Sequence, residues 1–121
     1  MSFDFRKIAE ILKDLGSNTP GIQASSLVSD LGLPIVSALP FDADEEIIAA
    51  MTAAIHNVSA RSVSELKRGT LKQVTIEGDD GYIILKGAGN FVLAVLADKS
   101  SNLGMIFLVI NKISKQINEM Q

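Results

Sequence analysis

Apolar residues near the N-terminus recur with the period of a helix. Phe5, Ile8, Leu12 and Leu15 are three or four residues apart, so their side chains fall on one helical face. Gly16, a residue type that often ends helices, follows the last of them. The pattern therefore predicts an amphipathic helix over about residues 4–15.

Five segments have the length and composition of β-strands. The first two are joined by a short turn and predict a hairpin that ends at Pro40, Phe41 and Asp42. The last three are separated by glycine-containing turns and predict a meander. The predicted strands cover residues 22–28, 33–39, 70–77, 82–86 and 91–97.

A long second helix is predicted between the hairpin and the meander. Either Asp42 or Asp44 can cap its N-terminus, and residues 45–46 give an acidic first turn, which the helix dipole favours. We expect the helix to reach Lys67 and to stop at Gly69. Its wheel has two nearly opposite apolar sides. Large residues form one side, at Ile47, Ile48, Met51, Ile55, Val58 and Leu66, and small residues form the other, at Ala49, Ala53, Ala60 and Ser64.

A third helix is predicted from about Asn102 to the C-terminus, although residues 105–110 alone could also form a strand. Its apolar stripe comprises Ile106, Val109, Ile110, Ile113, Ile117 and Met120.

The strands differ in how their apolar residues alternate, and this difference predicts their positions in the sheet. Residues 82–85 and 91–97 are apolar at both parities, as in strands covered on both faces. Residues 70–77 mix apolar and polar side chains and fit a half-exposed edge. We therefore expect an α/β (α+β) fold of order α-β-β-α-β-β-β-α. Its five-stranded antiparallel sheet, of strand order 2-1-5-4-3, lies between helix two and helices one and three.

Composition narrows the class of protein. The 121 residues fit a single domain over 1–121, and 47% hydrophobic residues with only 5% aromatics predict an aliphatic core. The net charge of -3 and the absence of a basic cluster argue against nucleic acid. The chain contains no cysteine, and its start does not have the pattern of a signal peptide. We expect a cytoplasmic protein without direct membrane insertion.

The sequence contains no recognisable catalytic, cofactor or metal motif. His56 is the only histidine, and neither a nucleophile elbow nor a phosphate-binding loop occurs. Residues 87–89 fit a hairpin turn better than a nucleotide-binding loop, and the acidic residues at 77–80 do not have calcium-loop spacing. We therefore expect no catalytic residue, no cofactor and no metal, so the protein is not predicted to be an enzyme.

Two features predict that the chain pairs with a copy of itself. The large side of helix two is expected to contact the sheet, which leaves the small side for close approach of a second helix two. The alternative is that alanine is present only because it favours helix. The edge strand has a free edge, and Lys72 is the one residue expected to hinder pairing there. The predicted dimer interface comprises Ala49, Ala53, Ala60, Ser64, Leu71, Gln73, Val74, Thr75 and Ile76.

The order of elements and three local phrases resemble the roadblock family of dynein light chains and GTPase co-regulators. The phrases are residues 77–82 (Glu-Gly-Asp-Asp-Gly-Tyr), 93–98 (Leu-Ala-Val-Leu-Ala-Asp) and 102–105 (Asn-Leu-Gly-Met), and the likeness extends from Phe5 to Met120. The resemblance implies a profilin-like sandwich. It also implies a homodimer in which the third strands join the two sheets and the second helices pack together.

The resemblance further implies a non-catalytic regulator or scaffold that binds a small Ras-like GTPase, with His56, Asn57 and Arg61 of helix two as candidate contacts. Another roadblock chain could replace the second copy. A purely structural light-chain or scaffold subunit, with no effect on nucleotide turnover, remains the alternative. A small-molecule sensor is a third reading, but the uniformly aliphatic segments argue against a deep polar pocket.

Overall fold

The computed structural model describes residues 3–40 and 42–121, and the predicted hairpin end at Phe41 lies outside the described residues. Helices and strands follow one another in the predicted order. The elements are α1 (Phe5–Asn18), β1 (Ile22–Ser29), β2 (Pro34–Ala38), α2 (Glu45–Glu65), β3 (Gln73–Gly78), β4 (Gly81–Ala88), β5 (Phe91–Asp98) and α3 (Leu103–Glu119).

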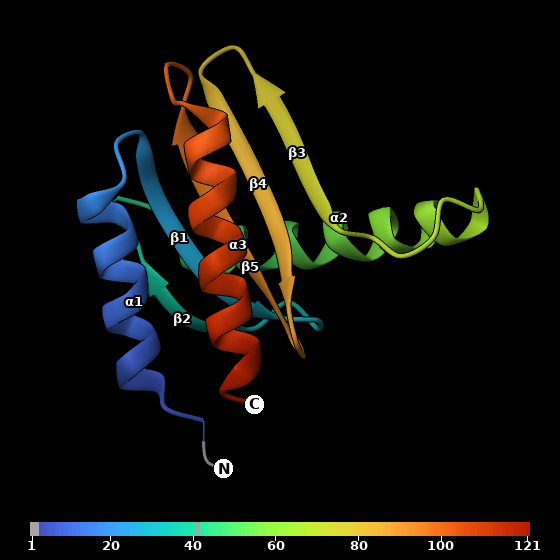
Figure 1. Cartoon of the computed structure of the whole chain (residues 1–121), viewed down its shortest axis with the longest axis horizontal. Coiled ribbons are helices and arrows are strands. Elements are labelled where there is room, and N and C mark those ends of the chain that lie inside the picture. Colours follow the sequence, from blue (N-terminus) through green and yellow to red (C-terminus); the bar gives the residue numbers. More distant parts are fainter. Residues whose placement is uncertain (1–2, 41) are drawn as a thin grey trace.

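The strands form one antiparallel sheet of order β2-β1-β5-β4-β3, which confirms the predicted topology. Helix α2 crosses one face of this sheet, and α1 and α3 cover the other face (Figure 1). The two strands predicted to be buried on both sides, β4 and β5, lie inside the sheet. Strand β3 forms one edge, also as predicted.

Two apolar layers hold the sandwich together. The larger lies between the sheet and helices α1 and α3, and it is aliphatic, as the composition predicted. The smaller layer consists of Leu85, Val92 and Ala94, with Ile55 of α2 packed against it. Helix α2 therefore covers less of its face than α1 and α3 cover of theirs.

Side-chain caps set where the helices begin. A carboxylate oxygen of Asp44 accepts a hydrogen bond from the backbone N–H of Ile47 at 3.1 Å, so Asp44, and not Asp42, caps α2. Asn102 caps α3 in the same way, through the backbone N–H of Met105 at 3.1 Å.

Two predicted helix ends were wrong. Helix α1 continues through Gly16 to Asn18 and is capped by Thr19, because the proline that disfavours helical geometry in its preceding residue stands only at position 20. Helix α2 ends at Glu65 and not at Lys67, because Lys67 has a left-handed backbone with φ of 57°.

The left-handed turn after α2 satisfies carbonyl groups at the helix end. The Arg68 N–H donates to the Val63 carbonyl at 2.8 Å, a bond that spans five residues and is typical of a Schellman ending. The chain then returns through residues 69–72 to β3, which begins at Gln73 and not at Thr70 as predicted.

The side chain of Gln121 fastens the β4–β5 turn to α3. Its amide nitrogen donates to the carbonyls of Ala88 at 2.7 Å and Ile117 at 3.1 Å, and its oxygen accepts from the Asn90 N–H at 2.8 Å. We expect Gln121→Ala to lower the free energy of unfolding by about 1 kcal/mol, because these backbone groups lose their partners. Urea denaturation measures the change. Gln116→Ala is the matched control, and an equal loss in both variants would contradict this role.

Candidate functional site

The side of α2 that packs on the sheet consists mainly of small residues, with Ile55 as a large residue that also packs there. The predicted assignment of the faces is therefore wrong for most of the helix. Ala49 is 0% exposed and Ala53 is 6% exposed within a single chain. Both approach the β1–β2 turn, where a Cβ placed on Gly32 would lie 3.6 Å from the Cβ of Ala53. Small side chains let the helix axis come close to this turn, which large side chains would prevent. Ala49 and Ala53 are therefore part of the fold of one chain and are not available to a second helix.

Three large apolar residues of α2 instead point away from the sheet. Ile47, Met51 and Val58, called the outer stripe below, are 60%, 57% and 66% exposed. Leu66, just beyond the helix, is also exposed. Burying a side chain of this size is worth about 1.5–3 kcal/mol, and a row of such exposed residues marks an interaction surface. The sequence pattern shows this stripe but wrongly predicts that it contacts the sheet.

A second apolar surface lies on the α2 face of the sheet, close to the free edge. Ile76 of β3 pairs with Ile83 of β4, which pairs with Leu96 of β5. Directly paired residues share a face, and Ile83 packs beside the small layer under α2. Ile76 is 37% exposed, and Ile83 and Leu96 are half-buried. These three residues are called the open row.

Helix α2 leaves the open row uncovered because of where it crosses the sheet. Its main contacts are with β1, β2 and β5. In Figure 1 it passes behind the lower half of the strands, whereas β3 and β5 end and β4 begins at the upper edge. The C-terminal half of α2 extends past β3 into solvent (Figure 1). One chain therefore presents an uncovered apolar row and, separately, an unsupported length of helix.

The remaining predicted interface residues lie along this free edge or on the projecting helix. Leu71, Gln73 and Val74 are half-buried, and Thr75 is exposed. On the helix, Ala60 is half-buried and Ser64 is exposed. None of these positions is enclosed by the chain itself.

The structure places the three predicted partner contacts in two different environments. His56 and Asn57 line a hollow of about 420 Å³ at the β1–β2 and β4–β5 turns, together with Asp30 and Asn90. The Asn57 amide donates to the Asp30 carbonyl at 3.2 Å. Arg61 lies outside this hollow and forms an exposed ion pair with Glu65, with Nε to Oε1 at 2.9 Å.

His56 is not the exposed residue that the sequence predicted. It faces β4, where its Nε2 would lie 3.9 Å from a Cβ on Gly87, and it is half-buried. Burial lowers the pKa of His56 below its usual value, so its ring is neutral at physiological pH. The imidazole therefore offers the hollow one hydrogen-bond donor and one acceptor without charge.

The described residues include no group of three or more histidine, cysteine, aspartate or glutamate side chains placed to hold a metal ion. Over the same residues, no helix combines the length and the apolar character needed to cross a membrane.

The fold and these surfaces define a class: a small α/β sandwich with one helix on one face, two on the other and an open sheet edge. Residues 8–97 match the Roadblock/LC7 domain, and the chain belongs to this family. A relative from Methanocaldococcus jannaschii, the uncharacterized protein MJ1340, is 36% identical over 113 residues, which cover 93% of this chain and 98% of the relative.

Solved structures share the same fold. Myxococcus xanthus MglB superimposes with a TM-score of 0.87 at 23% identity, covering 97% of this chain and 96% of that one. The Roadblock/LC7 domain from Streptomyces avermitilis gives a TM-score of 0.86 at 18% identity, covering 92% and 94%.

Proposed function

We propose that the chain acts as a non-catalytic homodimer whose outer stripe binds a small Ras-like GTPase. The observation that carries this proposal is the exposed outer stripe on α2. The stripe is exposed because α2 packs on the sheet mainly through its small residues. The family resemblance supports the GTPase as partner. The free edge of β3 and the open row support the dimer.

The two incomplete surfaces of one chain complement each other. If β3 pairs with β3 of a second copy about a two-fold axis, the sheets join and each projecting half of α2 lies over the other copy's open row. Helix α2 continues nine residues beyond His56, or about 14 Å at 1.5 Å per residue, which is close to three strand spacings. That span matches the three strands that carry the open row. A different Roadblock/LC7 chain with the same edge could take the second position.

Dimer formation leaves the outer stripe free. The stripe lies on the side of α2 that faces away from the sheet, so pairing through the sheet edge does not cover it. A two-fold axis also brings both outer stripes to the same side of the assembly. One continuous apolar surface of this kind suits one globular partner, and Asn57, next to Val58 along α2, adds an uncharged polar group.

The binding surface is tested with Val58→Asp and the purified small GTPases of the source cell, each loaded with GDP or with a non-hydrolysable GTP analogue. We expect wild-type protein to bind one of them and Val58→Asp to weaken binding by at least about tenfold, since a carboxylate would be desolvated in an apolar contact. Leu108→Asp, an equally exposed change on α3, is the control. Failure of every GTPase to bind wild-type protein in either state would overturn the proposal.

Nucleotide turnover separates regulation from scaffolding. A regulator changes the rate of GTP hydrolysis by ordering groups that the GTPase already contains. A structural subunit binds and leaves hydrolysis and exchange unchanged. Single-turnover hydrolysis with and without the dimer distinguishes the two.

A further inference from the structure

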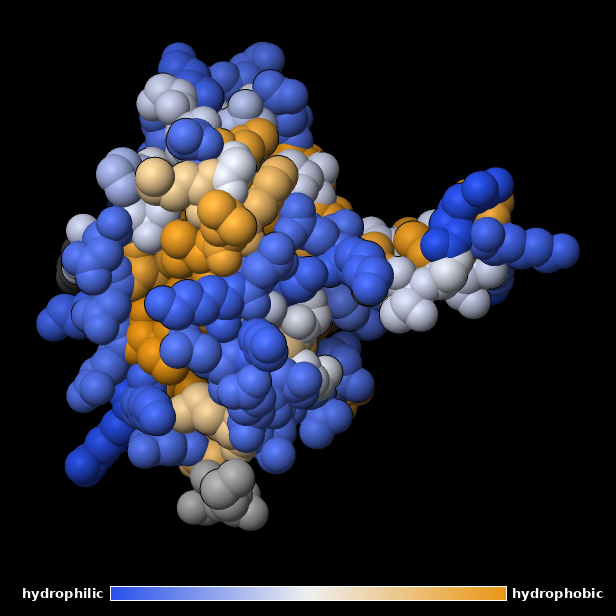
Figure 2. All heavy atoms as spheres, viewed as in Figure 1, coloured by the Kyte–Doolittle hydropathy of each residue, from blue (hydrophilic) through white to orange (hydrophobic). Residues whose placement is uncertain are grey.

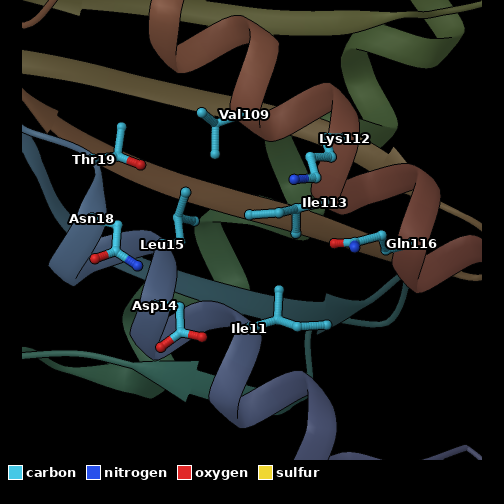
Figure 3. Close-up of a pocket in the computed structure, with 9 residues that line it drawn as sticks. All are labelled: Ile11, Asp14, Leu15, Asn18, Thr19, Val109, Lys112, Ile113 and Gln116. Atoms are coloured by element: carbon cyan, nitrogen blue, oxygen red, sulfur yellow. The ribbon is translucent and has the colours of Figure 1, made fainter.

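An apolar groove runs between α1 and α3, on the face of the molecule opposite α2. Two hollows of about 390 Å³ and 300 Å³ lie along it and share Ile11 and Gln116, so the groove is continuous. Its floor and lower walls include Ile11, Leu15, Val109 and Ile113 (Figure 3). In Figure 2 the same region shows as an apolar band between the hydrophilic outer surfaces of the two helices.

The rims of the groove carry charges in an alternating arrangement. At one end, Asp14 of α1 stands opposite Lys112 of α3, on the two walls seen in Figure 3. At the other end, Lys7 of α1 and Glu119 of α3 line the second hollow. All four residues are exposed. Among the described residues the only ion pair is that of Arg61 with Glu65, so the opposing charges do not close the groove by pairing across it.

We propose that this groove binds an amphipathic α-helix of another protein. From Lys7 to Asn18 the α1 wall extends eleven residues, about 16 Å, which accommodates three helical turns. An apolar floor between two antiparallel helices fits the apolar stripe of a third helix, as in other helix-in-groove complexes. The uncovered charges on the rims then act on the flanks of the bound helix and set its specificity.

The rim charges dictate the sequence pattern of the bound helix. Beside α1 it carries an acidic residue near Lys7 and a basic residue near Asp14. Beside α3 it carries a basic residue near Glu119 and an acidic residue near Lys112. This pattern is unchanged when the helix is turned end for end about the normal to the sheet, so the charges match in either direction. A helix with every charge reversed is mismatched in both directions.

The groove is independent of the proposed GTPase surface. It lies on the far side of the sheet from α2 and does not include the free edge of β3 (Figure 1). A dimer could therefore hold one partner on its α2 face and two helices on its α1 and α3 faces. The inference goes beyond the proposed function and does not depend on it.

Two synthetic peptides of identical composition, each about four helical turns long, provide the test. Both carry leucine at i, i+3, i+4 and i+7; one has the charge pattern above and the other has every flank charge reversed. By NMR of labelled full-length protein, we expect the matched peptide to shift the amides of Ile11, Leu15, Val109 and Ile113. We expect the reversed peptide to bind at least about tenfold more weakly, since like charges then face each other.

Two variants make the result decisive. The exposed quadruple variant Lys7→Glu, Asp14→Lys, Lys112→Glu and Glu119→Lys should exchange the preference between the peptides without disturbing the core. Val109→Asp should abolish binding of both. Equal binding of the two peptides, no binding of either, or shifts confined to α2 would overturn the proposal. It would also be overturned if Val109→Asp reduced the oligomeric state of the free protein, because the groove would then be covered by another copy.

Discussion

Ile76→Asp is expected to prevent formation of the proposed dimer. Ile76 is the outermost residue of the open row and lies on the free edge strand β3. Because a two-fold interface contains each residue twice, the substitution would place two carboxylates into one apolar contact. Desolvating an unpaired polar group costs roughly 2–7 kcal/mol, enough to dissociate a dimer of micromolar affinity.

Multi-angle light scattering measures this change directly. Wild-type protein should have twice the chain mass of 12.9 kDa, and Ile76→Asp should have the mass of a single chain. Leu108→Asp introduces the same charge on an exposed residue of α3 and should remain dimeric. A monomeric wild-type protein at tens of micromolar, or a variant that stays dimeric, would refute the proposed interface.

Ala53→Arg is expected to destabilise the fold itself, by about 3–5 kcal/mol, because an arginine here would be buried without a partner. Ala53 is 6% exposed, and its environment is the β1–β2 turn beside Gly32. The change would force α2 away from the sheet before any question of dimer formation arises. Thermal unfolding should show a large fall in Tm and a loss of cooperativity.

Ala60→Arg is the matched comparison for Ala53→Arg. Ala60 lies on the same side of α2 but beyond the main contacts with the sheet, and it is only half-buried. We expect this variant to keep the circular dichroism spectrum of a folded protein. Similar destabilisation in both variants would mean that the projecting half of α2 packs within its own chain.

The topology could be predicted because strands buried on both faces and strands at an edge differ in how their apolar and polar residues alternate. Residues 91–97 are apolar at both parities, and they form β5 at the centre of the sheet. Residues 73–77 alternate in polarity, and they form β3 at its edge. The pairings within the hairpin and within the meander then follow from short connections between antiparallel neighbours. The β1–β5 pairing joins segments far apart in the chain and does not follow from such a connection.

The faces of α2 could not be predicted, because a helical wheel shows that two sides are apolar but not which one meets the sheet. Hydrophobicity alone favours the side with Met51 and Val58. The opposite side packs on the sheet instead, because the helix must pass close to the β1–β2 turn, where Ala49 and Ala53 leave room for Gly32. That constraint depends on residues about twenty positions apart and has no counterpart in local periodicity.

The candidate site was predicted only where it depends on a strand edge. Val74, Thr75 and Ile76 lie on the free edge, as expected from their alternation. The environment of His56 was missed because it depends on a neighbour distant in the sequence, Gly87 of β4. Contacts of this kind come from the packing of α2 on β4, which no local motif encodes.

The projecting half of α2 couples secondary structure to association. Helical segments of about ten residues are only marginally stable in water when no other element packs on them. Helical order at this end of α2 therefore depends on what covers it, and part of the free energy of any association there is spent on fixing backbone dihedral angles. The measured free energy of binding is the free energy of the new contacts less the cost of ordering this helical segment. Substitutions that alter only helix propensity in this segment would therefore change the affinity without altering a contact.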